Sequence, residues 1–197
     1  MSYIWFPLRL FAQLIVLLYP GVLVFWLVMH SHIEHWRKVG KKAYWIASIG
    51  WPATAMPLLY FRKSLFPASR PVPPVPVLLA GILALLLAFI LARRAGDTIS
   101  LRTLVGLPEL DPGKNRQPLM TAGIYSKTRN PVYLAHWLLI FSSAAITGFQ
   151  ANWALFALDC IVLPLMIRAE ERELLARYGT EFVAYMRRAP RFFPKFT

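Results

Sequence analysis

Two polar segments flank the last pair of apolar runs, and they hold the residue types from which a binding site could be built. Residues 123–133 read Gly-Ile-Tyr-Ser-Lys-Thr-Arg-Asn-Pro-Val-Tyr and lead into one apolar run, whereas residues 168–174 read Arg-Ala-Glu-Glu-Arg-Glu-Leu and leave the next. Only residues 149–152 separate the two runs, so we expect a tight helical hairpin that brings both segments to one membrane surface. The sequence therefore predicts a single pocket there. The alternative is that both segments are only solvated helix ends without a binding role, since Asn-Pro is a good helix start and Arg/Glu runs are usually solvated.

Metal-binding residue types occur at the end of the first apolar run, at His30, His32, Glu34 and His35. Their spacing is irregular and no cysteine accompanies them, so we expect a cluster at the membrane interface and no metal site. A further histidine, His136, follows the first polar segment, and two interpretations stay open for it: it lines the predicted pocket, or it is a packed, hydrogen-bonded histidine of the helix interior.

The elements that position these segments are membrane helices by composition. Hydrophobic residues make up 57% of the 197 residues and charged residues only 16%, against about 45–50% and about 25% in ordinary globular chains. This composition excludes a disordered chain, and the single cysteine, Cys160, excludes a disulfide framework. Five runs approach the length of about 20 apolar residues that a membrane span needs. They are Phe11–Met29, Ala43–Phe61, Val77–Ala92, Val132–Gly148 and Trp153–Ile167.

Positive charge is divided unevenly between the two sides of these five spans. Of the 22 Lys and Arg residues, four lie between the first two spans, seven in residues 93–129 and seven after residue 167, which leaves four for the other side. The positive-inside rule then predicts a multi-pass protein with its N-terminus outside and its C-terminus in the cytoplasm, in the inner membrane if the cell is bacterial. Basic residues between apolar runs face anionic lipid, so membrane lipids are expected as partners and nucleic acid is not.

The polar motifs, taken together, resemble a known family. Gly-x-Tyr-x-x-x-Arg-Asn-Pro-x-Tyr, then the hairpin, then Glu-Glu-x-x-Leu and Tyr-Gly-x-Glu-Phe-x-x-Tyr, is similar to the isoprenylcysteine carboxyl methyltransferase family, which includes phospholipid methyltransferases. The resemblance covers about residues 117–196. It implies an enzyme that transfers a methyl group from S-adenosylmethionine to a lipophilic acceptor, isoprenylcysteine-like or lipid-like, which arrives through the bilayer.

The resemblance also implies the cofactor-binding residues. They are Gln117, Pro118, Leu119, Met120, Tyr125, Arg129, Asn130, Pro131, Val132, Tyr133 and Glu170. A carboxylate suits the sulfonium and ammonium groups of the cofactor, and tyrosine rings offer faces to a sulfonium. We assign no catalytic residue, because methyl transfer needs mainly positioning and exclusion of water. Glu173 is expected on the solvated side of its helix.

Two positions depart from the family pattern. Asn130 stands where the family usually has histidine, so this position is assigned to binding and not to proton transfer. Met166 stands where isoprenylcysteine enzymes have an arginine that contacts the substrate. We therefore expect Arg168, with His136, to bind a lipophilic small molecule or lipidated substrate.

The expected architecture is all-α and integral to the membrane, with about five transmembrane helices and with a cytosolic loop and C-terminal helices that close a cofactor pocket. Residues 1–92 are expected to form three N-terminal membrane helices, and residues 93–197 the methyltransferase core. Two other functions stay open. One is an NADPH-dependent membrane reductase of the sterol reductase type, which has a similar Arg-His-Pro-x-Tyr motif, and the other is a non-catalytic membrane scaffold.

Overall fold

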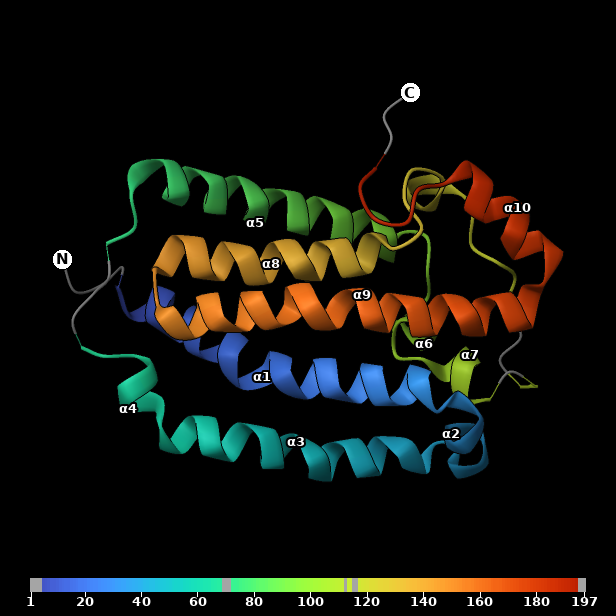
Figure 1. Cartoon of the computed structure of the whole chain (residues 1–197), viewed down its shortest axis with the longest axis horizontal. Helices are drawn as coiled ribbons and strands as arrows, with labels where there is room; N and C mark the ends of the chain where they lie inside the picture. Colours follow the sequence, from blue (N-terminus) through green and yellow to red (C-terminus); the bar gives the residue numbers. More distant parts are fainter. Residues whose placement is uncertain (1–4, 69–71, 112, 115–116, 195–197) are drawn as a thin grey trace.

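The protein is an all-helical bundle. The computed structural model describes residues 5–68, 72–111, 113–114 and 117–194, and every regular element in these ranges is a helix, as the sequence predicted. Arg70, Arg116 and Lys195, which enter the charge balance, lie outside the described residues. Five long helices run side by side (Figure 1). They are α1 (Trp5–Ser31), α3 (Lys42–Tyr60), α5 (Val75–Gly96), α8 (Pro131–Thr147) and α9 (Gln150–Tyr178).

Three of these helices, α1, α5 and α9, are long and apolar enough to cross a membrane, whereas α8 is apolar but shorter. The longest is α9, whose 29 residues extend to about 44 Å at about 1.5 Å per residue. This length exceeds the hydrocarbon core of a bilayer, which is about 30 Å thick, and α9 projects past the end of α8 on the side where α10 lies (Figure 1). The predicted fifth span and the charged segment after it are thus one continuous helix.

Helices α8 and α9 form the expected hairpin. Gly148 ends α8 in the left-handed region, with φ of 74°, and its N–H donates to the carbonyl of Ala144 at 2.8 Å. Asn152 then fixes the hairpin against α1, because its Nδ2 donates to Ser143 Oγ at 3.0 Å and to the carbonyl of Ala12 at 3.2 Å. This buried amide links three helices at the end of the bundle away from the polar segments.

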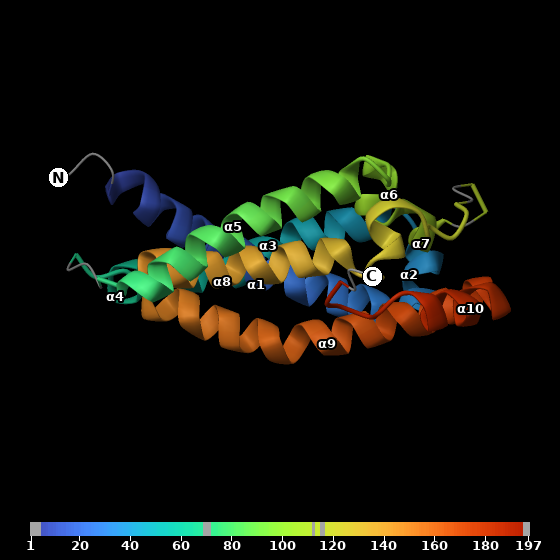
Figure 2. The same ribbon diagram turned by 90° about the horizontal axis from the view of Figure 1, so that it is seen from above.

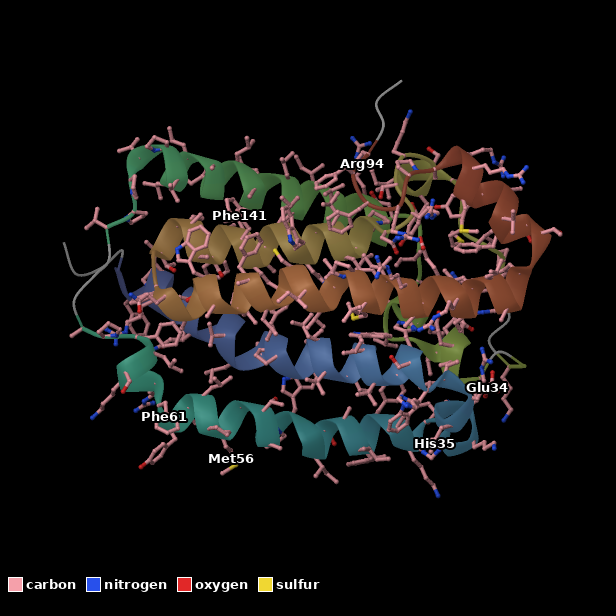
Figure 3. The ribbon with its side chains drawn as sticks, viewed as in Figure 1. Glu34, His35, Met56, Phe61, Arg94 and Phe141 are labelled. Atoms are coloured by element: carbon pink, nitrogen blue, oxygen red, sulfur yellow. The ribbon has the colours of Figure 1, made fainter. Side chains whose placement is uncertain are left out.

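Close helix packing and an apolar outer surface characterise the rest of the bundle. Helix α5 packs along α8 with Gly81 at the contact, where a Cβ atom would lie 2.8 Å from the Cβ of Ala145. Large apolar side chains point away from the bundle instead of into it, including Phe89 of α5 and, in Figure 3, Met56 and Phe61. Such a surface fits contact with lipid.

Short helices gather at one end of the bundle (Figures 1 and 2). They are α2 (Ile33–Val39), α6 (Leu101–Leu104), α7 (Leu107–Leu110), the 3₁₀ helix η1 (Gly123–Ser126) and α10 (Thr180–Arg188), while α4 (Arg62–Leu65) lies at the opposite end. The predicted loop between α5 and α8 therefore contains three short helices, which cover the end of the bundle where α9 projects.

Candidate functional site

A cavity lies among the short helices at this end of the bundle. It measures about 160 Å³, and a single buried water needs only about 10–15 Å³ on this scale. All eleven residues predicted to bind a cofactor line it, as does His136. The structure thus brings these residues together from the extended segment before η1, from η1, from the start of α8 and from α9.

Glu170 lies in the wall of this cavity, and one of its oxygens accepts no hydrogen bond from a described residue. Its Oε2 is buried, makes no hydrogen bond with a described residue and lies 4.0 Å from Nε2 of His30. The same His30 nitrogen is 3.3 Å from the hydroxyl of Tyr133, and the His30 ring stacks on Trp26 with centroids 5.4 Å apart. Helix α1 therefore supplies a histidine and a tryptophan to the cavity that the sequence did not assign to it.

The histidine cluster expected from the sequence does not form as one group. His30 is buried in the cavity wall, whereas Glu34 and His35 project outward from α2 (Figure 3). Among the described residues, no group of three or more His, Cys, Asp or Glu side chains is arranged to hold a metal ion.

An ion-pair network links α2, α7 and α9 on one side of the cavity. Glu173 accepts from Arg37 Nη2 at 2.6 Å and from Arg177 Nη2 at 2.6 Å, and Arg177 also lies 3.3 Å from Glu109 Oε1. The expectation that Glu173 is solvated is wrong, because its side chain is only 2% exposed. Burial raises the pKa of Glu109, whose Oε2 lacks a partner among the described residues.

Aromatic side chains of α9 and α10 hold the loop segments in place. The hydroxyl of Tyr178 donates to the carbonyl of Gln117 at 2.9 Å, and that of Tyr185 donates to the carbonyl of Tyr125 at 2.7 Å. The rings of all three tyrosines line the cavity together with Phe182. Burial raises the pKa of Tyr125 and of Tyr185 above the ordinary value, so both phenols are neutral at physiological pH.

The cavity is closed on another side by a buried arginine–glutamate pair. Arg129 donates to Glu171 Oε1 from Nε at 3.0 Å and from Nη2 at 2.8 Å, and Glu171 Oε2 accepts from Arg191 Nε at 2.9 Å. Arg129 also donates to the carbonyls of Met186 and Ala189. These bonds hold the chain after α10 across the start of α8.

These surroundings favour a cationic organic ligand. Two carboxylates in the cavity wall, Glu109 and Glu170, each have one buried oxygen that accepts no hydrogen bond from a described residue, and aromatic residues line the same space. Carboxylates attract positive charge strongly where water is scarce, and aromatic faces attract cations such as ammonium and sulfonium groups.

Arg168, expected to bind the substrate, does not line this cavity. It lies instead on a separate groove on the outer side of α9, together with Arg172 and Arg191. Because successive helix residues point about 100° apart, Arg168 and Glu170 face different sides of α9.

Sequence reasoning missed several residues of the cavity. Tyr178, Phe182 and Tyr185 belong to the pattern Tyr-Gly-x-Glu-Phe-x-x-Tyr that carried the resemblance, so the motif already contained a signal for them. Other lining residues come from elements far away in the sequence, for which no local pattern gave a signal. They include Trp26, His30, Thr103 and Glu109.

Comparison with known proteins gives a different answer from the motif resemblance. No family model and no solved structure matches the chain. The chain is 38% identical over 84 residues to the cobalt-zinc-cadmium resistance protein CzcN of Cupriavidus metallidurans, and 37% identical over 84 residues to the nickel-cobalt-cadmium resistance protein NccN of Alcaligenes xylosoxydans xylosoxydans. The similarity is to metal-resistance proteins. It covers 42% of this chain and 38% and 39% of the two relatives, respectively.

These relatives contradict the predicted family, and with it the predicted methyltransferase function. Both are named for resistance to metal ions, and neither name indicates a methyltransferase. The similarity does not favour the reductase or the scaffold either. The prediction rested on short motifs at helix ends. Asn-Pro recurs there because it favours the start of a helix, and Glu-Glu recurs because charged residues at helix ends are exposed to solvent. Motifs of this kind can be shared without a shared reaction.

Proposed function

We propose that this chain is a membrane component of cellular resistance to divalent transition-metal ions, such as cobalt, zinc, nickel and cadmium. The observation that carries the proposal is the identity of 38% and 37% to two resistance proteins over 84 residues. Three helices suited to a bilayer support the membrane setting. Because less than half of each relative is matched, the role of the whole protein is part of the proposal.

Within this role, the cavity is proposed to bind a cationic organic ligand. The buried oxygens of Glu109 and Glu170 that accept no hydrogen bond from a described residue, together with the surrounding aromatic residues, support this class of ligand. S-adenosylmethionine, the cofactor expected from the sequence, is the first candidate, because its sulfonium and ammonium groups suit these carboxylates. Backbone groups of residues 117–120, which lie outside any helix, offer hydrogen bonds to its adenine. This proposal concerns binding alone.

The membrane arrangement is proposed to have five spans. The other two long helices, α3 with 19 residues and α8 with 17, support this number by running alongside the three long apolar helices. The charge balance supports an outside N-terminus and a cytoplasmic C-terminus, so that the cavity opens at the cytoplasmic surface. A lipophilic partner would then reach the cavity from the bilayer.

Growth of the source cell in the presence of metal ions tests the proposed role. Deletion of the gene is expected to lower the tolerated concentration of at least one of Co²⁺, Zn²⁺, Cd²⁺ and Ni²⁺, and the intact gene is expected to restore it. Glu170→Gln should fail to restore growth at an equal protein level in the membrane, whereas Glu181→Gln, on the exposed surface of α10, should restore it. If the deletion strain tolerates all four ions as well as the wild type does, the proposed role is wrong. If Glu170→Gln restores growth fully, the cavity is not needed for resistance.

A further inference from the structure

A second hollow lies on the outer side of the bundle, between the end of α1 and the projecting half of α9. This groove measures about 620 Å³. Glu171 lines both the groove and the cavity described above, so its pair with Arg129 separates the two spaces. The groove faces the surroundings of the bundle, not its interior.

Two arginines of the groove are exposed and carry unpaired charge. Arg168 and Arg172 lie one turn apart on α9, where side chains four residues apart are neighbours. Neither makes a hydrogen bond or an ion pair with another described residue. A third, Arg191, lines the same groove and shares Glu171 with Arg129. One carboxylate thus serves two arginines, and the groove keeps a net positive charge.

Apolar side chains also line the groove and are open to its surroundings. Leu165, one turn before Arg168, is 47% exposed, and Leu175 is 41% exposed. Leu27 of α1 lines the groove beside them. Arg168 directly follows the last apolar residues of the span, so the groove extends from the hydrocarbon region of the bilayer into the headgroup region.

We propose that this groove binds one anionic phospholipid. Its phosphate would lie between the guanidinium groups of Arg168 and Arg172, with Arg191 at the rim, and an acyl chain would follow Leu165 and Leu27. Guanidinium groups match phosphate oxygens in a bidentate geometry. The apolar half of the groove favours a lipid over a free phosphate ion, because a free ion leaves this surface uncovered. Anionic lipids are also concentrated at basic membrane-proximal segments.

Native mass spectrometry of the full chain in detergent tests the proposal, with phosphatidylglycerol, phosphatidylcholine and inorganic phosphate as probes. The wild type is expected to retain one phosphatidylglycerol molecule at least about ten-fold more tightly than phosphatidylcholine, because only the former has a net negative charge. The double variant Arg168→Gln/Arg172→Gln should bind it about 25-fold more weakly, at about five-fold for each arginine. The matched control Arg187→Gln/Arg188→Gln removes the same charge from exposed positions of α10 and should change binding less than about two-fold.

Three results would overturn the proposal: an equal loss in the control, equal retention of phosphatidylcholine, or binding of inorganic phosphate as tight as that of the lipid. The thermal unfolding temperature of the double variant without lipid should match that of the wild type, since both side chains are exposed and neither has a hydrogen bond or ion pair with another described residue. If the double variant does not fold, Arg168→Lys/Arg172→Lys keeps the charge and removes the bidentate geometry. A several-fold loss of phosphatidylglycerol binding in that variant supports the site, and unchanged binding overturns it.

Discussion

Arg129 and Glu171 are joined by two hydrogen bonds, of 3.0 and 2.8 Å, where the chain after α10 crosses the start of α8. Both side chains are 8% exposed. Each has further partners, since Arg129 also donates to the carbonyl of Ala189 and Glu171 accepts from Arg191. This pair therefore connects the start of α8, the projecting part of α9 and the chain after α10.

Loss of the Arg129 side chain should loosen the segment after α10. Arg129→Ala leaves Glu171 buried with only Arg191 as a partner, and breaking a buried pair in this way costs about 3–5 kcal/mol. We expect a lower unfolding temperature in detergent and faster proteolysis near residues 189–192. Arg188→Ala, on the exposed side of α10, is the matched control and should leave both unchanged. Equal stability of the two variants would contradict the structural role of the pair.

Glu170 should determine the affinity of the cavity for a cationic ligand. Glu170→Gln keeps the size and removes the charge, and a hydrogen bond to a charged group contributes about 1.5–3 kcal/mol. Calorimetry should therefore show a loss of roughly ten- to a hundred-fold in S-adenosylmethionine affinity. The exposed Glu181→Gln should bind like the wild type. If the wild type does not bind this molecule, the cofactor proposal is wrong, and if Glu170→Gln binds it equally well, Glu170 is not the ligand's partner.

Substitution by alanine should lower the stability of the bundle at Gly81 but not at Gly50. At Gly81 a Cβ atom would meet Ala145 at 2.8 Å, so Gly81→Ala overpacks the contact between α5 and α8 and should destabilise the bundle by about 1–3 kcal/mol. At Gly50 a Cβ atom meets nothing within 4 Å, so Gly50→Ala in α3 should be neutral or stabilise by up to about 1 kcal/mol. Chemical unfolding in detergent measures both. A stabilising Gly81→Ala would refute this packing of α5 on α8.

Glu109 should make stability depend on pH. Burial raises its folded-state pKa above the ordinary value of 4.5, so the folded protein holds this proton more tightly than the unfolded chain does. The stabilisation that protonated Glu109 gives the folded state is fully present below the ordinary pKa and is lost as pH rises through the raised pKa. The free energy of unfolding of the wild type, relative to Glu109→Gln, should therefore fall as pH rises above about 4.5. A difference that is constant with pH, or that grows, would contradict the raised pKa.

Reporter fusions test the proposed arrangement in the membrane. A reporter after residue 197 is expected in the cytoplasm, and one in the linker at Pro73, which precedes α5, on the outside. The same side for both would mean that the number of spans between them is even instead of odd.

Local features of the sequence were enough to predict the class of fold and the meeting of the two polar segments, residues 123–133 and 168–174. Composition and the length of apolar runs require helices in a bilayer, because only helices satisfy their own backbone groups within a single segment. The short turn at Gly148 and Phe149 then fixed the hairpin, and the hairpin brought residues 117–133 next to Glu170. These inferences succeeded because they depend on local hydropathy and on short distances along the chain.

The surroundings of Glu170, in contrast, depend on how distant helices pack together. His30 and Glu109 reach the cavity because α1 packs against α9 and because α7 covers the end of the bundle, and neither contact leaves a pattern in the local sequence. The orientation of Glu173 was misjudged for the same reason, since its partner Arg37 lies 136 residues away. Charge pairs between distant segments depend on how whole helices pack, and helix packing is decided by surfaces that a linear motif does not contain.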